Sequence, residues 1–240
     1  MNQNDFFGSI NTKEQELGVS QSLPVLMRKV YTWMAMALVI TGITAYGVAS
    51  SPAILQALYG SRILFFGLII AELALVWGVS ARIEKLSLTT ATLLFILYSV
   101  INGATLSYIF LAYTMASISK VFFITAGTFA AMAVVGYTTK RDLSRIGGYL
   151  FMGLIGVIIA SLVNLFVRSS GFELILSYIT VLIFVGLTAW DTQKIKQMLQ
   201  FAPETSEGAQ KVALLGALSL YLDFINLFIH LLRILGNSRN

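Results

Sequence analysis

Two aspartates, Asp191 and Asp223, lie in or next to the last two of seven long apolar segments. A carboxylate at membrane depth is costly unless it is paired, protonated or hydrated, so each is a functional candidate by default. Each has a ready partner in the other, and two carboxylates held close together cannot both ionise cheaply. They then share a proton and titrate as a unit. This is the chemistry of a proton-sensitive gate or of a cation site, since Ca²⁺ prefers oxygen ligands.

The last apolar segment carries a polar stripe. On a helix its members share one face, because they recur every 3 or 4 residues: Ser219, Asp223, Asn226, His230 and Arg233. Such a stripe must face protein or water, which predicts that the last helix lies inside a bundle and lines a path. Taken alone, Asn226 fits better as a packing residue that hydrogen-bonds a neighbouring helix. His230 fits both interpretations, because it lies near the expected membrane interface.

Two more residues complete the candidate site. Glu72 lies in the middle of the second apolar segment, which makes it a further ion-path candidate beside Asn226 and His230. Arg82, at the end of that segment, can bind a carboxylate through two donors and is a candidate latch on Asp191. The alternative for Arg82 is a snorkelling interfacial residue. The alternative for Asp191 is a solvated carboxylate at the end of its helix.

Composition places these residues in an all-α integral membrane protein. The chain has 240 residues, of which 57% are apolar and only 11% charged, whereas a soluble domain has about 25% charged residues. A membrane span needs roughly 20 apolar residues. The seven spans are expected at about 30–50, 62–81, 88–111, 119–138, 147–167, 172–190 and 212–235. This gives a polar tail over residues 1–29, a transmembrane domain over residues 30–236 and a short C-terminal tail over residues 237–240.

The basic residues predict the orientation. Eleven of the sixteen Lys and Arg residues fall on the side of the N-terminus and five on the other side. By the positive-inside rule the N-terminus is cytoplasmic, and seven spans place the C-terminus across the membrane. The alternative is a re-entrant or interfacial seventh segment, which would return the C-terminus to the cytoplasm.

Several function classes find no support in the sequence. The chain has no cysteine and one histidine, so neither Cys/His nucleophilic catalysis nor a multi-histidine metal site is expected. No phosphate-binding G-x-x-x-x-G-K-[ST] loop occurs. No glycine precedes either aspartate, unlike in intramembrane aspartyl proteases. We therefore expect no enzyme activity and no bound cofactor, and the net charge of +5 reports orientation rather than nucleic-acid binding.

Four segments resemble the bacterial branch of the Bax inhibitor-1 family, the transmembrane Bax-inhibitor-motif proteins. They are Asn102–Ser107, Lys140–Leu143 with Ile146–Leu150, Trp190–Gln193 and Leu218–Phe228. The resemblance implies a seven-helix bundle in the bacterial inner membrane with the last helix at its centre. It implies a pH-sensitive calcium leak controlled by a di-aspartyl pair, which matches Asp191 and Asp223 and implies that they meet. Arg82 and Glu72 are the nearest matches to an arginine and an acidic residue on the family's second helix.

Three functional hypotheses remain. The first is a passive, proton-gated Ca²⁺ pathway whose partners are the lipid bilayer, calcium ions and protons. The second is a non-conducting regulatory protein that binds other membrane proteins, such as a quality-control protease, through the N-terminal tail. The third is a proton-coupled secondary transporter, for which the chain shows no clear pair of broken helices.

Overall fold

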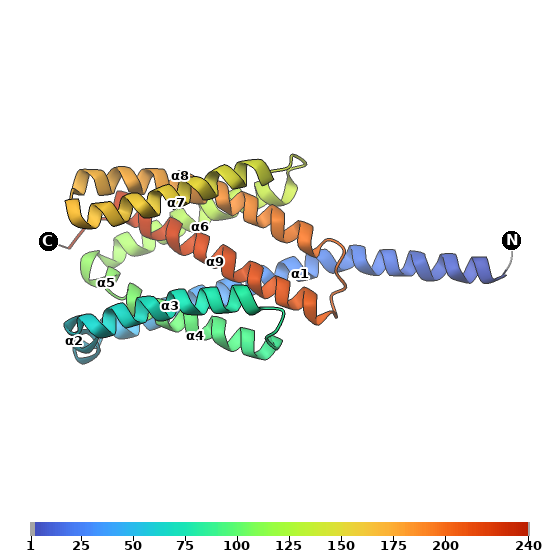
Figure 1. Ribbon diagram of the computed structural model, residues 1–240, viewed down its shortest axis with the longest axis horizontal. Helices are drawn as coiled ribbons and strands as arrows, with labels where there is room; N and C mark the ends of the chain where they lie inside the picture. Colours follow the sequence, from blue (N-terminus) through green and yellow to red (C-terminus); the bar gives the residue numbers. More distant parts are fainter. Residues whose placement is uncertain (1–2, 240) are drawn as a thin grey trace.

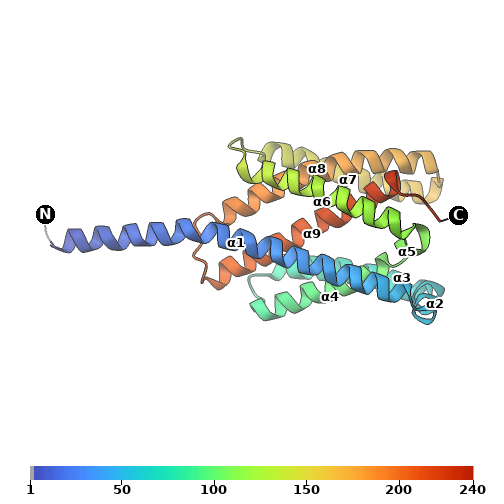
Figure 2. The same ribbon diagram turned by 180° about the vertical axis from the view of Figure 1, so that it is seen from behind.

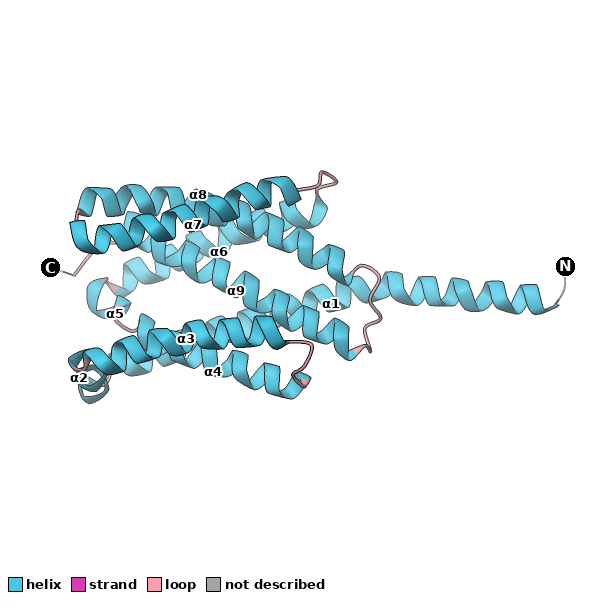
Figure 3. Ribbon diagram, in the orientation of Figure 1, coloured by secondary structure: helices cyan, strands magenta, loops and turns pink. Residues whose placement is uncertain are grey.

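The computed structural model describes residues 3–239, and the side chains from Ser22 onward. Over that range the regular structure is helical, and Figure 3 shows helices joined by short loops. The helices are α1 (Gln3–Ala49), α2 (Pro52–Gly60), α3 (Arg62–Arg82), α4 (Leu88–Leu106), α5 (Ile109–Ala112), α6 (Met115–Thr138), α7 (Ser144–Val167), α8 (Ser170–Leu199) and α9 (Glu207–Leu235). Seven stretches among the described residues are long and apolar enough to cross a membrane, which confirms the predicted all-α membrane fold.

Short polar side chains begin most of these helices. The side-chain oxygen at each of these caps accepts a hydrogen bond from a backbone N–H of the first turn: Ser61, Ser87, Thr114, Ser169 and Ser206. These caps satisfy donors that the helix itself leaves unpaired. The sequence therefore ends one helix and starts the next within a few residues.

The last helix lies at the centre of the bundle. It packs against α1, α4, α6 and α8, and in Figure 1 it runs diagonally between α3 and α4 on one side and α6, α7 and α8 on the other. In its most apolar window 67% of the residues are buried, compared with 6% in α3 and in α7. The polar stripe thus belongs to the helix that is most enclosed by protein, as predicted.

The seventh span is one continuous helix. Its 29 residues extend for about 43 Å at 1.5 Å per residue, which exceeds the roughly 30 Å thickness of the hydrocarbon core. The two chain termini lie at opposite ends of the molecule (Figures 1 and 2). This arrangement favours a crossing helix over the re-entrant alternative.

Two boundaries differ from the prediction. Helix α8 does not end near residue 190 but continues to Leu199, so Asp191 lies within the helix. At the other end of the chain, α1 begins at Gln3 and its candidate membrane span begins at Ser22. Leu26 and Val30 are fully buried. The last residues of the predicted 1–29 tail therefore form part of the bundle.

The C-terminal tail is attached to the turn between α5 and α6. The backbone N–H of Asn237 donates to Ser117 Oγ at 2.9 Å, and that of Arg239 donates to the Ala112 carbonyl at 2.9 Å. These bonds fix the end of α9 at the same end of the bundle as α2 and α5.

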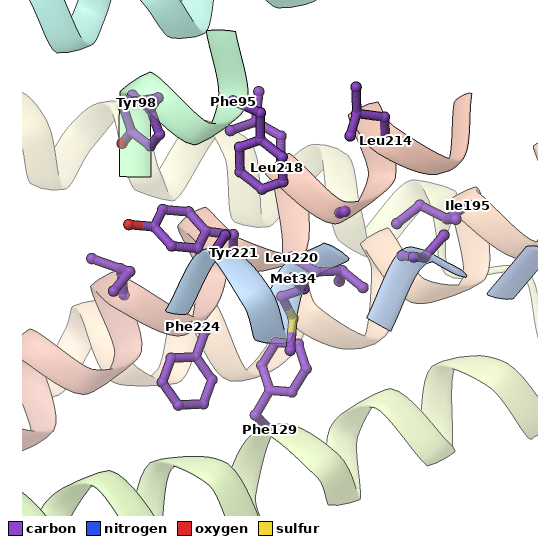
Figure 4. Close-up of a cluster of buried hydrophobic side chains, with 14 of the residues drawn as sticks. Met34, Phe95, Tyr98, Phe129, Ile195, Leu214, Leu218, Leu220, Tyr221 and Phe224 are labelled. Carbon is purple, nitrogen blue, oxygen red and sulfur yellow. The ribbon is translucent and has the colours of Figure 1, made fainter. Parts of the chain in front are cut away.

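Aromatic contacts fix α9 against its neighbours. The ring of Tyr221 meets those of Phe95 and Tyr98 on α4 edge to face, with centroids 5.8 Å apart in both pairs. Phe224 meets Phe129 of α6 at 5.6 Å. Figure 4 shows these rings on successive sides of α9. Edge-to-face pairs have defined geometry, so this core sets the rotation of α9 and therefore the direction of Asp223.

Candidate functional site

Asp223 is a buried carboxylate in the central helix. Only 4% of its surface is exposed, and within the described residues its Oδ2 has no hydrogen-bond partner. A buried acceptor without a donor costs about 1–3 kcal/mol, and more when it is charged. Such an atom in a native fold needs a proton, a water molecule or an ion. The structure therefore singles out Asp223 independently of the sequence pattern.

Asp191 of α8 is the acidic neighbour of Asp223. Asp191 is half-buried, and its carboxylate lies close enough to interact electrostatically with that of Asp223. Lys194, one turn further along α8, is the cation that acts on Asp191. The structure thus brings together the two aspartates that the sequence selected.

A glycine contact holds α8 and α9 in this register. Gly216 of α9 lies against the side chain of Ile195 of α8, and a Cβ at Gly216 would approach three Ile195 carbons to 3.0 Å. Gly216 is two helical turns before Asp223, and Ile195 is about one turn after Asp191. The close approach of the two helices therefore lies on the faces that carry the two carboxylates.

The helix segment around Asp191 is fixed from two further sides. Gly136 of α6 lies against the backbone of Ala189, and Gly147 of α7 lies against the ring of Trp190, so neither position has room for a Cβ. Small residues permit such close contacts between membrane helices. Packing therefore fixes the direction of Asp191, and no ion pair to this residue is formed within the part of the chain that the structure describes.

Gln193 attaches the same segment to the loop between α6 and α7. Its Oε1 accepts from the N–H of Leu143 at 2.8 Å, and its Nε2 donates to the carbonyl of Arg141 at 2.8 Å. In that loop Asp142 accepts from the N–H of Ser144 at 2.9 Å. Hydrogen bonds from Ser144 hold the pKa of the exposed Asp142 carboxyl below its usual value. The neighbouring Thr192 Oγ1 is buried, and the Tyr31 side chain of α1 is the polar group that interacts with it.

Arg82 does not reach the aspartates. It is exposed at the end of α3, and no ion pair joins it to Asp191 or Asp223 in the described part of the chain. The reason is the position of α3, which packs on α2 and α4 at the edge of the bundle. The predicted latch is therefore not formed in this structure, and Lys194 is the cation beside Asp191.

Glu72 belongs to a separate polar cluster. It accepts from Thr105 Oγ1 of α4 at 2.6 Å and lies beside Asn102. Asn102 Oδ1 in turn accepts from the hydroxyl of Tyr221 at 2.9 Å, which lies 2.7 Å from Thr41 Oγ1 of α1. This chain of hydrogen bonds joins α3, α4, α9 and α1.

The sequence pattern did not identify Tyr221 or Thr41 as candidate site residues. The available signal was the position of Tyr221, two residues before Asp223. An aromatic residue in an apolar run is nevertheless typical of a packing residue.

The remaining residues of the polar stripe lie in the C-terminal half of α9, toward the end of the bundle that holds the C-terminus. Asn226 donates to the Leu222 carbonyl of its own helix at 2.8 Å, so its hydrogen bond does not join two helices. His230 Nδ1 lies 3.2 Å from Ser177 Oγ of α8. Arg233 forms an ion pair with Glu173 of α8 at 3.2 Å. These contacts hold the last turns of α9 against α8.

Neither aspartate reaches the cavity that the C-terminal part of the polar stripe lines. Asn226 and His230 line a cavity of about 270 Å³, which neither Asp191 nor Asp223 lines. Asp223 lies about 4.5 Å deeper along the helix axis than Asn226, and the side chain of Leu227 beside them is fully buried. The cavity that Asn226 and His230 line therefore ends about one helical turn before the carboxylate pair.

Comparison with known proteins places this chain in a family. The family model described as "Inhibitor of apoptosis-promoting Bax1" matches residues 23–240. The chain is 51% identical over 218 residues to Inner membrane protein YbhL of Escherichia coli K12, covering 90% of this chain and 93% of that protein. An uncharacterized protein of Borreliella burgdorferi is 46% identical over 214 residues, with 89% and 92% coverage. Protein RP147 of Rickettsia prowazekii is 42% identical over 238 residues, with 98% and 99% coverage. A family match across nearly the whole chain, together with seven candidate membrane helices among the described residues, shows that the protein belongs to the Bax inhibitor-1 family.

Proposed function

We propose that the protein is a pH-sensitive calcium leak channel of the bacterial inner membrane, gated by Asp191 and Asp223. The observation that carries the proposal is the unpartnered Oδ2 of Asp223, buried in the central helix beside a second carboxylate. The name of the Escherichia coli relative supports the inner-membrane location. The excess of basic residues at one end of the bundle supports a cytoplasmic N-terminus.

In this proposal a shared proton keeps the path closed. With one proton between them, the carboxylates attract each other and hold α8 against α9. When the proton leaves, two negative charges repel each other in a medium of low dielectric constant. Separation of the pair then opens the barrier at Leu227 and presents oxygen ligands that suit Ca²⁺. Calcium is the permeant ion in this mechanism, and protons are the gating ligand.

The proposal predicts the sign of the pH dependence. Because proton loss opens the barrier, calcium flux into dye-loaded liposomes that contain the purified protein should rise from pH 6 to pH 8. Asp223→Asn removes the shared proton site, so the flux of this variant should no longer change with pH. Asp142→Asn is the matched control, since Asp142 is an exposed carboxylate whose lowered pKa keeps it ionised over this range.

Two results would contradict the gate. One is an unchanged pH profile in Asp223→Asn. The other is a wild-type flux that rises as the pH falls, because a shared proton would then open the path instead of closing it. Flux no greater than that of empty liposomes at every pH would contradict conduction itself.

The second candidate is a non-conducting regulatory protein. The observation in its favour is the first part of α1, which extends as a helix beyond the rest of the bundle (Figure 2) and whose sequence is largely polar. A membrane partner, such as a quality-control protease, would bind this extension. Deletion of residues 2–20 should then abolish co-purification with the partner, whereas Asp223→Asn should leave it intact.

A further inference from the structure

The end of the bundle that holds the C-terminus carries a polar cavity between α7, α8 and α9. Its volume is about 600 Å³, and its lining includes Arg168, Glu173 and Arg233. Glu173 and Arg233 neutralise each other at 3.2 Å. No ion pair to Arg168 is formed within the described residues, so one unneutralised cation lines the cavity. The proposed ion gate at the opposite half of α9 does not use this charge.

Further donors in the cavity favour an anion. Asn164 and Ser170 also line it, and Ser170 is the first residue of α8, a helix of 30 residues. The N-terminus of a long helix carries a partial positive charge that favours an anion, and in α8 the Ser169 cap already accepts from the N–H of Phe172. Together with the guanidinium of Arg168, these groups match an oxyanion such as a phosphodiester.

An apolar groove continues directly from this cavity. This groove is the cavity of about 270 Å³ that Asn226 and His230 line. It shares Ser161, Leu165 and His230 with the polar cavity. Its remaining lining is mostly aliphatic and includes Ile158 and Leu162. These two residues are 52% and 59% exposed, so the groove opens sideways toward the surrounding hydrocarbon. A charged compartment and an apolar groove therefore meet at Ser161.

We propose that the two cavities form a binding site for one anionic phospholipid, with the phosphodiester beside Arg168 and an acyl chain along α7. The charge of Arg168 complements the headgroup, and the aliphatic groove complements the chain. A free phosphate would occupy only the polar cavity that Arg168 lines, and the apolar groove would remain unused. The groove is the cavity that Asn226 and His230 line, so the lipid site shares this cavity with the proposed calcium pathway but does not use the gate at Asp191 and Asp223.

The test measures binding of dioleoyl phosphatidylglycerol to the delipidated protein by native mass spectrometry. Arg168→Asn removes the cation, and Asn tolerates the left-handed backbone of this position, where φ is 54°. Ser161→Trp blocks the junction of the two cavities, and Trp is well accommodated at a membrane interface. The control is Arg62→Asn, which removes an exposed arginine at the same end of the bundle but outside the cavity.

The expected result is a loss of about tenfold in lipid affinity for Arg168→Asn, as for one charge-assisted contact at a partly exposed site. Ser161→Trp should also weaken binding, and Arg62→Asn should not. Glycerol phosphate should compete poorly, because it lacks the acyl chain. Wild-type affinity in Arg168→Asn or Ser161→Trp, or an equal loss in Arg62→Asn, would overturn the proposal. Competition by glycerol phosphate at equal affinity would assign the cavity to a free anion instead.

Discussion

Gly216 of α9 faces Ile195 of α8 so closely that a Cβ at Gly216 would lie 3.0 Å from three carbons of that side chain. This contact sets the spacing of the two helices that carry Asp191 and Asp223. A methyl group at Gly216 would require three carbons of Ile195 to shift together by a few tenths of an ångström, and where the packed interior resists this shift the two helices must separate. The spacing of the carboxylates is thus sensitive to single methyl groups at this contact.

Gly216→Ala should destabilise the bundle and alter its pH response. Overpacking of this kind costs typically about 1–3 kcal/mol, and the added methyl group pushes α8 away from α9. We expect a lower melting temperature in detergent and a calcium flux that depends less on pH. Ile195→Val removes one methyl group on the opposite side and should partly restore both properties in the double variant. Gly127→Ala is the control, since a Cβ at Gly127 meets nothing within 4 Å.

The two aspartates should behave as one unit. If Asp191 and Asp223 share a proton, then Asp191→Asn and Asp223→Asn each remove the same interaction, and their effects should not add. We expect the double variant to have a pH profile and a melting temperature close to those of Asp223→Asn alone. The check is a double-mutant cycle on both quantities. Additive effects would show that the carboxylates act independently and would remove the basis for a shared-proton gate.

Spans and burial could be predicted from the sequence because they follow from local patterns. A membrane core requires about 20 apolar residues per helix, and this alone locates the seven spans. The 3-to-4-residue spacing of the polar stripe likewise requires an enclosed last helix. Each of these two features depends only on the residues of a single segment of the chain.

Contacts between distant segments could not be predicted in the same way. The sequence predicts a contact of Arg82 with Asp191, because both residues lie near the cytoplasmic ends of their spans. The helix that carries Arg82, α3, instead packs on α2 and α4. Asp191 seemed to end its helix because polar residues follow it, yet α6 and α7 cover that turn through Gly136 and Gly147. The partners of Tyr221 come from α1 and α4. Each case depends on which helices are neighbours, which hydropathy does not encode.

Tyr221→Phe should weaken the contact of α9 with α1 and α4. The hydroxyl is the donor for Asn102 Oδ1 at 2.9 Å, and its removal leaves a buried acceptor without a donor. The expected cost is about 1–3 kcal/mol, measured as a lower melting temperature in detergent. Tyr178→Phe is the control, because Tyr178 is 53% exposed on α8 and forms no such bond in the described structure. Equal melting temperatures for the two variants would contradict a structural role for the hydroxyl.

Gln193→Glu should weaken the attachment of the loop between α6 and α7 to helix α8. The amide of Gln193 bonds in both directions, accepting from Leu143 and donating to the carbonyl of Arg141. A carboxylate can keep the first bond but places an oxygen against the Arg141 carbonyl, which replaces an attraction by a repulsion. We expect faster cleavage by trypsin after Lys140 and Arg141, because proteolysis follows local opening of the backbone.

Gln200→Glu makes the same chemical change at an exposed position just beyond the end of α8 and should leave the cleavage rate unchanged. The loop also fixes the turn that carries Asp191, so the flux of Gln193→Glu should respond less steeply to pH than that of the wild type. Cleavage that is equally fast in Gln193→Glu, Gln200→Glu and the wild type would mean that packing of Gly136 and Gly147 is sufficient to hold this turn.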